Sequence, residues 1–132
     1  MTARRVLVAD DDADIRDLVA FKLRGAGLEV DAFADGASAL EHVRAGLPVV
    51  PDLVVLDVTM PGLSGVDVCR ALRAAPETAE VPVVLLTAKV RESDVATGFS
   101  AGTDDYVPKP FSPKELLHRV RAVLDRVEAA TS

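Results

Sequence analysis

The sequence predicts an α/β fold in which a doubly wound, five-stranded parallel β-sheet carries helices on both faces. Short, almost continuously apolar runs, typical of strands buried on both faces, alternate along the chain with segments of helical periodicity. The chain has 132 residues, of which 49% are hydrophobic and 27% charged, as in an ordinary globular domain. We therefore expect one domain over residues 1–132, with its core at about 4–127.

The N-terminal part supplies two predicted strands and two predicted helices. RRVLVAD (4–10) is an apolar run that predicts a buried strand, and LEVDAF (28–33) alternates apolar and polar residues as strands do. Asp12 can cap a helix over Ala13–Arg24, and Gly36–Arg44 is the second predicted helix. The inner face of the first helix is expected to contain Ile15, Leu18, Val19 and Leu23.

The central part adds two predicted strands that are wholly buried in character. DLVVLD (52–57) again ends in an aspartate, and VPVVLLT (81–87) ends in a threonine. Between them, after the loop MPGLSG, Ser64 can cap a helix that extends to Ala74. A weaker helical pattern with few apolar anchors covers about residues 91–100.

The C-terminal part supplies the last strand and the last helix. DDYV (104–107) predicts a short fifth strand. The segment FSPKELLHRVRAVLDRV begins with a capping box, in which Ser112 is the cap, Pro113 takes the first helical position and Glu115 follows. An apolar stripe then predicts a long fifth helix, formed by Leu116, Leu117, Val120, Val123, Leu124 and Val127.

Polar side chains gather where these strands end. Parallel strands joined by right-handed crossovers all end at one edge of the sheet, where folds of this class bind ligands. Asp10 and Asp11, Asp57, Thr87 and Lys109 end or follow four of the predicted strands. Neighbouring carboxylates repel one another, and a hard divalent cation offsets that repulsion. Mg²⁺ fits best, because it is usually held by one or two carboxylates together with water and phosphate oxygens.

This combination of groups suits phosphoryl transfer. A metal ion with an open coordination position and a lysine spread the charge of the transferring group. An aspartate beside them can act as the nucleophile and become an aspartyl phosphate. Asp12 and Asp14 are better explained as a helix cap and a first-turn carboxylate, where a helix favours negative charge.

Four segments together resemble a known family. They are VLVADDDADIR, PDLVVLDVTMPGLSG, PVVLLTA and GTDDYVPKPF, which occur in order and with the right spacing. Over nearly its whole length the chain resembles the receiver domain of bacterial two-component response regulators. The resemblance implies a flavodoxin-like (CheY-like) fold with sheet order 2-1-3-4-5 and five helices. It also implies a cytoplasmic signalling phosphoacceptor rather than an enzyme with a separate substrate.

The resemblance gives roles to the residues at the predicted sheet edge. Asp57 corresponds to the phosphoacceptor, which takes its phosphoryl group from a histidine kinase or phosphotransfer protein. Asp11 and Asp57 correspond to direct Mg²⁺ ligands, Asp10 to a ligand through water, and the backbone carbonyl of Thr59 to a further ligand.

The resemblance also implies groups that respond to phosphorylation. Thr87 and Lys109 correspond to residues that contact the phosphoryl group, and the Lys109–Pro110 bond is expected to be cis. Tyr106 corresponds to an aromatic switch residue that turns inward as Thr87 moves.

Signal output is expected on the face formed by the fourth helix, the fifth strand and the fifth helix. One branch of the family forms symmetric dimers through charged residues there, and this chain has Arg91, Asp94, Asp104, Glu115 and Arg119 at that face. We expect a homodimer on phosphorylation and a downstream protein partner or an output domain that is not in this chain. A stand-alone receiver and a fragment of a longer regulator both remain open.

Composition excludes several other classes. The net charge of −6 argues against direct nucleic-acid binding, which normally needs a basic face. One cysteine, Cys69, excludes an internal disulfide and a cysteine-cluster metal site. No apolar run is long enough for a signal peptide or a membrane span, so we expect a soluble, cytoplasmic chain without membrane partners.

Three alternative functions remain to be weighed. An enzyme of the haloacid dehalogenase type needs a second acid two residues after the nucleophile, where this chain has Thr59. A flavodoxin-like electron carrier needs a phosphate loop rich in Ser, Thr and Gly after the first strand, where this chain has DDDAD. The third alternative is a receiver-like interaction module that works without phosphorylation.

Overall fold

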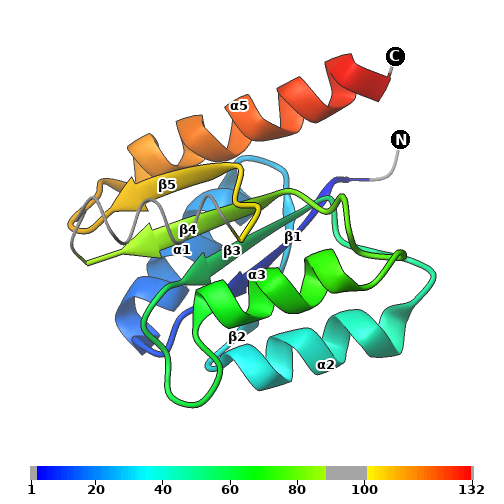
Figure 1. Cartoon of the computed structure of the whole chain (residues 1–132). Coiled ribbons are helices and arrows are strands. Elements are labelled where there is room, and N and C mark those ends of the chain that lie inside the picture. Colours follow the sequence, from blue (N-terminus) through cyan, green and yellow to red (C-terminus); the bar gives the residue numbers. More distant parts are fainter. Residues whose placement is uncertain (1–2, 89–100, 132) are drawn as a thin grey trace.

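A five-stranded parallel sheet forms the centre of the molecule. The computed structural model describes residues 3–88 and 101–131. The strands are β1 (Arg5–Ala9), β2 (Glu29–Phe33), β3 (Leu53–Asp57), β4 (Val83–Thr87) and β5 (Asp105–Pro108), in the order β2-β1-β3-β4-β5 (Figure 1). This order and the parallel pairing confirm the predicted topology.

Within the described ranges the chain forms four helices. They are α1 (Ala13–Gly25), α2 (Gly36–Gly46), α3 (Gly65–Ala74) and α5 (Pro113–Thr131). The helix predicted over residues 91–100 lies outside the described residues. None of the helices that the structure describes is long and apolar enough to cross a lipid bilayer.

The helices cover both faces of the sheet and create two core layers. α2 and α3 cover one face, where Leu40, Val68 and Leu72 pack against Leu56 and Leu85. α1 and α5 cover the opposite face, as Figure 1 shows, and their apolar side chains pack against the alternate residues of the same strands. Because successive strand residues contact different layers, the three central strands β1, β3 and β4 are almost wholly apolar.

Local side-chain hydrogen bonds fix where the helices begin. Asp12 accepts the backbone N–H groups of Asp14 and Ile15 at the start of α1, as predicted. Ser64 and Asp67 form a capping box at the start of α3, and Ser112 Oγ accepts the N–H of Glu115 at the start of α5. The cap of α2, Asp35, was not predicted from the sequence.

The prediction that Leu18 points inward is wrong. The Leu18 side chain is 49% exposed, whereas Val19, Ala20 and Leu23 are buried. Neighbouring residues of a helix are about 100° apart around its axis. The buried face of α1 is centred on Val19 and Leu23, so Leu18 lies outside that face. Val127 is also partly exposed, at 36%, near the C-terminal end of α5.

Candidate functional site

Asp57 is the buried carboxylate at the centre of the candidate site. It is the last residue of β3 and pairs in register with Leu86 of β4, so it lies at the C-terminal edge of the sheet. Only 4% of the residue is exposed. Its Oδ1 accepts the backbone N–H of Thr59 at 3.4 Å, and its Oδ2 lies 3.4 Å from Lys109 Nζ.

Asp10 follows β1 directly and is completely buried. Its backbone N–H donates to the carbonyl of Phe33, which continues the ladder between β1 and β2. The side chain is held at both oxygens: Oδ1 accepts the N–H of Asp12 at 2.9 Å, and Oδ2 accepts Lys109 Nζ at 3.0 Å. Asp10 is therefore fixed in the structure and faces the same lysine as Asp57.

Asp11 completes a group of three carboxylates. Asp11 is exposed, and one carboxylate oxygen from each of Asp10, Asp11 and Asp57 lies within 4.8 Å of the other two. Carboxylate oxygens are the ligands that Mg²⁺ prefers in proteins. The predicted convergence of these three residues is therefore present in the fold.

Lys109 links the two buried carboxylates. It follows β5, and its backbone N–H donates to the carbonyl of Thr87, so the chain stays beside β4 as it leaves the sheet. The Lys109–Pro110 peptide bond is cis. The lysine side chain is 16% exposed and places its ammonium between Asp10 and Asp57. The ammonium thus offsets part of the repulsion between two buried negative charges.

The surroundings of Asp57 favour its protonated form. Burial, and then the negative charge of Asp10, raise the pKa of Asp57 to about 6, although Lys109 and the Thr59 N–H act in the opposite direction. Burial by itself lowers the pKa of Lys109, but the hydrogen bond to Asp10 and the charges of both aspartates outweigh it, so the pKa of Lys109 is raised. Lys109 is therefore a stable cation in the site.

A close backbone approach brings α3 against the end of β3. A Cβ atom added to Gly65 would lie 2.4 Å from the carbonyl oxygen of Asp57 and 3.2 Å from Leu56 Cβ. The Gly65 N–H donates to the carbonyl of Val58. Only glycine fits this position without a shift of the backbone that carries Asp57.

Thr87, Thr59 and Tyr106 are the other residues with a predicted role at or near this site. Thr87 is buried at the end of β4, and Thr59 is exposed two residues after Asp57. Tyr106 is buried in β5 opposite Leu85, in the core layer under α2 and α3. Side chains alternate along a strand, so Thr87 and Tyr106 belong to the same face of the sheet.

The residues predicted for an output face are only partly described. Arg91 and Asp94 lie outside the described residues. Asp104 makes intramolecular contacts: its Oδ2 accepts the N–H of Val83 at 2.8 Å and forms an ion pair with Arg73 Nη2 at 3.3 Å. Arg119 lies 3.3 Å from Asp105, and Glu115 is exposed.

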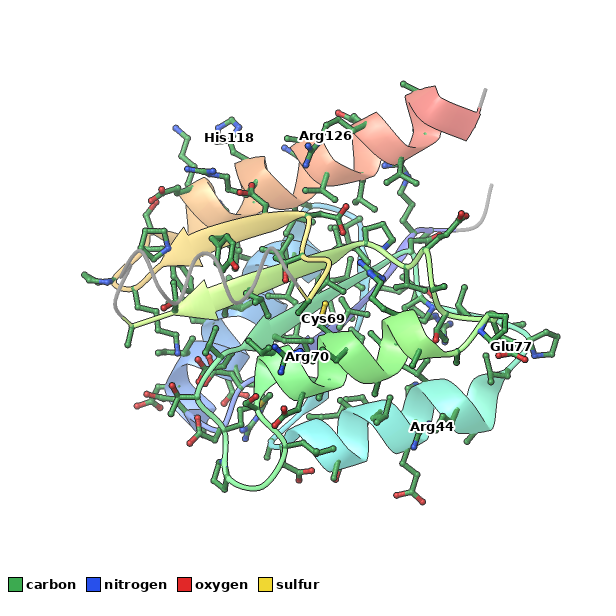
Figure 2. All side chains as sticks on the ribbon, viewed as in Figure 1. Arg44, Cys69, Arg70, Glu77, His118 and Arg126 are labelled. Atoms are coloured by element: carbon green, nitrogen blue, oxygen red, sulfur yellow. The ribbon has the colours of Figure 1, made fainter. Side chains whose placement is uncertain are left out.

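Two other side chains lie away from the site. Figure 2 shows Cys69 on the side of α3 that faces the sheet and His118 on the outer side of α5. Cys69 is completely buried and its thiol donates to the carbonyl of Ala101, so it is part of the core.

Two site residues had no predicted role. Arg16 Nη1 donates to the carbonyl oxygen of Asp10 at 2.9 Å, and Gly65 permits the close approach described above. No spacing pattern could have identified the arginine contact, because a long side chain can reach many backbone carbonyls. The role of Gly65 was also not predictable, because it directly follows the cap residue Ser64 and glycines are common near helix starts for other reasons.

Comparison with known protein families shows the class to which this chain belongs. The family model of the response regulator receiver domain matches residues 6–121. The chain therefore belongs to the response regulator family as a receiver domain, a signalling component of two-component systems.

Individual relatives agree with this class. The chain is 49% identical over 123 residues to the DNA-binding response regulator MtrA of Mycobacterium tuberculosis. The aligned region covers 93% of this chain and 51% of that protein. It thus spans about half the length of the curated relatives that it matches.

Solved structures show the same fold. Chemotaxis protein CheY4 of Vibrio cholerae superposes with a TM-score of 0.86 at 30% identity, over 92% of this chain and 99% of that chain. DrrB of Thermotoga maritima, described as an OmpR/PhoB homologue, superposes with a TM-score of 0.83 at 37% identity, over 95% of this chain and 54% of that chain.

Proposed function

We propose that this receiver domain accepts a phosphoryl group on Asp57 from a phosphohistidine of a histidine kinase or phosphotransfer protein. The observation that carries the proposal is the position of Asp57. Its buried carboxylate lies at the C-terminal edge of the sheet, 3.4 Å from a lysine ammonium and in one group with Asp10 and Asp11. Asp10 shares these features, but both of its oxygens are held more closely, by the Asp12 N–H at 2.9 Å and by Lys109 Nζ at 3.0 Å, whereas the corresponding contacts of Asp57 are both 3.4 Å long.

The transfer is a nucleophilic displacement at phosphorus. One oxygen of the Asp57 carboxylate attacks the phosphorus, and the phosphorus–nitrogen bond of the phosphohistidine breaks. The electron pair of that bond stays on the imidazole, which takes up a proton, and Asp57 becomes an acyl phosphate. A pKa of about 6 leaves Asp57 mostly ionised at pH 7, as a nucleophile requires. Attack of water on the same phosphorus releases phosphate and restores the carboxylate.

The carboxylate group fits Mg²⁺. Asp11, Asp57 and the backbone carbonyl of Thr59 are the proposed direct ligands, and Asp10 acts through water. The fit is supported by three carboxylates whose oxygens lie within 4.8 Å of one another, with no nitrogen or sulfur ligand among them. When bound, the ion supplies positive charge that offsets the charge of the phosphoryl oxygens.

Lys109 and Thr87 are the proposed contacts of the phosphoryl group. The Lys109 ammonium already lies 3.4 Å from an oxygen of Asp57, so it can donate to a phosphoryl oxygen attached there. The Thr87 hydroxyl belongs to the neighbouring strand end, one strand away from Asp57. Movement of Thr87 towards the phosphoryl group is proposed to let the Tyr106 ring turn inward, because both residues belong to the same face of the sheet.

Output is proposed through the helix predicted over residues 91–100, together with β5 and α5. The supporting observations are the position of Tyr106 in β5 and the charges of Glu115 and Arg119 on α5. Because several relatives are named as DNA-binding or transcriptional regulators of about twice this length, we propose that a separate output domain carries any nucleic-acid contact. The residues 1–132 then act as one receiver domain with its core at about 4–127.

Intact-protein mass spectrometry after incubation with acetyl phosphate tests the proposal. The wild type is expected to gain one phosphoryl group with Mg²⁺ and none with EDTA, and Asp57→Asn is expected to gain none. Asp17→Asn, a matched change of an exposed aspartate on α1, should react like the wild type. A wild type that gains nothing, either from acetyl phosphate or from a phosphorylated kinase, would instead identify an interaction module that works without phosphorylation.

A further inference from the structure

Arg16 makes two hydrogen bonds to the turn that carries Asp10 and Asp11. Its side-chain Nη1 donates to the carbonyl oxygen of Asp10 at 2.9 Å, whereas its backbone N–H makes the ordinary i→i−4 helical bond to the carbonyl of Asp12, also at 2.9 Å, which does not depend on the side chain. The two acceptors are the residues on either side of Asp11. Arg16 is half-buried in the first turns of α1, so its guanidinium lies against the turn rather than in open solvent.

Asp11 depends on this turn for its position. Its side chain is exposed, and no residue in the described ranges donates a hydrogen bond to its carboxylate or forms an ion pair with it. The position of the Asp11 oxygen relative to Asp10 and Asp57 therefore depends on the backbone of residues 10–12 and on the side-chain torsions of Asp11 itself. A bond that restricts this backbone also restricts the Asp11 carboxylate.

The Arg16 bond is independent of the groups that react. Two other side-chain contacts hold the turn: Asp10 Oδ1 accepts the N–H of Asp12, and Asp10 Oδ2 pairs with Lys109, which is shared with Asp57. The second of these contacts involves the lysine that is proposed to contact the phosphoryl group. The bond from Arg16 ends on a backbone carbonyl and involves neither Asp57 nor Lys109, so phosphorylation of Asp57 does not require it to break.

We infer that Arg16 is a positioning residue for magnesium: it holds the turn at Asp10–Asp12 so that Asp11 is placed to bind the ion. This inference rests on the proposed function, in which Asp11 is a metal ligand. Without the guanidinium, the carbonyl of Asp10 loses its donor and the turn gains freedom. The Asp11 oxygen then spends less time near its partners, and ordering it becomes part of the cost of binding the ion.

Calorimetric titration of the metal-free 132-residue chain with MgCl₂ tests the inference directly. Arg16→Ala is expected to raise the Kd for Mg²⁺ about tenfold, the lower end of the range for residues that orient a metal ligand. Arg16→Lys keeps the charge and one donor, so its Kd should rise less. The Mg²⁺ concentration for half-maximal phosphorylation should shift by the same factor, with the maximal rate at saturating Mg²⁺ unchanged.

Arg24→Ala is a matched control on the same helix. Arg24 Nη2 also donates to a backbone carbonyl, that of Val30, at 2.9 Å and with the same sequence separation of six residues as the Arg16 bond, but at the other end of α1. Its removal should lower the melting temperature about as much as Arg16→Ala does and leave the Kd for Mg²⁺ unchanged.

Three results separate the possible failures. If Arg16→Ala binds Mg²⁺ as tightly as the wild type, or more tightly because a positive charge has gone, the positioning role is wrong while the proposed function stands. If Arg24→Ala weakens binding equally, the effect comes from α1 as a whole and the inference is also wrong. A wild type that binds no Mg²⁺ overturns the proposed function, and the inference with it.

Discussion

Asp57 places a negative charge where burial and a neighbouring carboxylate make that charge unfavourable. In the metal-free folded chain its pKa is about 6, above its ordinary value of 3.8. Between these two pH values the folded state binds more protons at this residue than the unfolded state does. The contribution of Asp57 to stability is therefore full below about pH 4 and is lost as the pH rises through about 6.

This shift predicts a pH-dependent difference between the wild type and Asp57→Asn. At pH 7 without divalent metal, the variant should be more stable by about 1–3 kcal/mol, and the difference should shrink towards pH 4. Urea unfolding with EDTA at pH 4 to 7.5 measures both free energies of unfolding. A difference that does not vary with pH would show that the environment of Asp57 does not raise its pKa.

The residues of the site could be predicted to different extents. Asp10, Asp57 and Lys109 were found because each ends or follows a strand, and a parallel sheet brings such positions to one edge. The sharing of Lys109 by two buried carboxylates was not predicted, because it depends on side-chain distances of 3.0 and 3.4 Å. The contact of Arg16 with the Asp10 carbonyl escaped prediction for the same reason.

At the scale of elements, the start of α3 and the end of β3 depend on each other. Gly65 lies so close to the Asp57 carbonyl that a methyl group there must displace backbone. Gly65→Ala is expected to reduce the free energy of unfolding by about 1–3 kcal/mol, as overpacking does. Gly25→Ala, in a position with no atom within 4 Å of an added Cβ, should leave stability unchanged or raise it by up to about 1 kcal/mol.

Thermal and urea unfolding of both variants check this prediction, and phosphorylation adds a second readout. Displacement of the Asp57 backbone by Gly65→Ala should also slow phosphorylation by acetyl phosphate, whereas Gly25→Ala should react at the wild-type rate. Equal stability and equal rates for the two variants would contradict the structural role given to Gly65.

Elements were predicted well where the local signals agree. Apolar runs ending in polar residues predicted β1, β3 and β4, alternation predicted β2, and the caps at Asp12 and Ser64 fixed two helix starts. Leu18 failed because periodicity alone does not set the centre of a buried face. That centre depends on how α1 packs on the sheet, which several elements decide together.

At the scale of the molecule, the sheet separates a reacting edge from the proposed output face. The candidate site lies where the strands end, while α5 covers one face together with α1 (Figure 1). Topology rules predicted this arrangement, since right-handed crossovers allow few alternatives. The output partner could not be predicted, because it depends on surface chemistry that does not affect the fold.

We expect the protein to form a homodimer when it is phosphorylated. With beryllium fluoride and Mg²⁺ as a phosphoryl mimic, the protein is expected to elute from a gel-filtration column as a dimer, and without them as a monomer. Arg119→Glu, on α5, should remain a monomer because it reverses a charge on the proposed face. Arg44→Glu, an exposed arginine on α2 over the opposite face (Figure 2), should dimerise like the wild type. An unchanged monomer at high protein concentration would rule out the dimer.

The most direct test of Asp57 as the phosphoacceptor is to identify which residue becomes phosphorylated. Borohydride reduces an aspartyl phosphate to homoserine, so peptide mapping of the phosphorylated, reduced wild type shows which aspartate carried the group. We expect homoserine at position 57 alone, formed only when both Mg²⁺ and acetyl phosphate were present. Homoserine at position 10 or 11, or at no position in a protein that has gained a phosphoryl group, would contradict it.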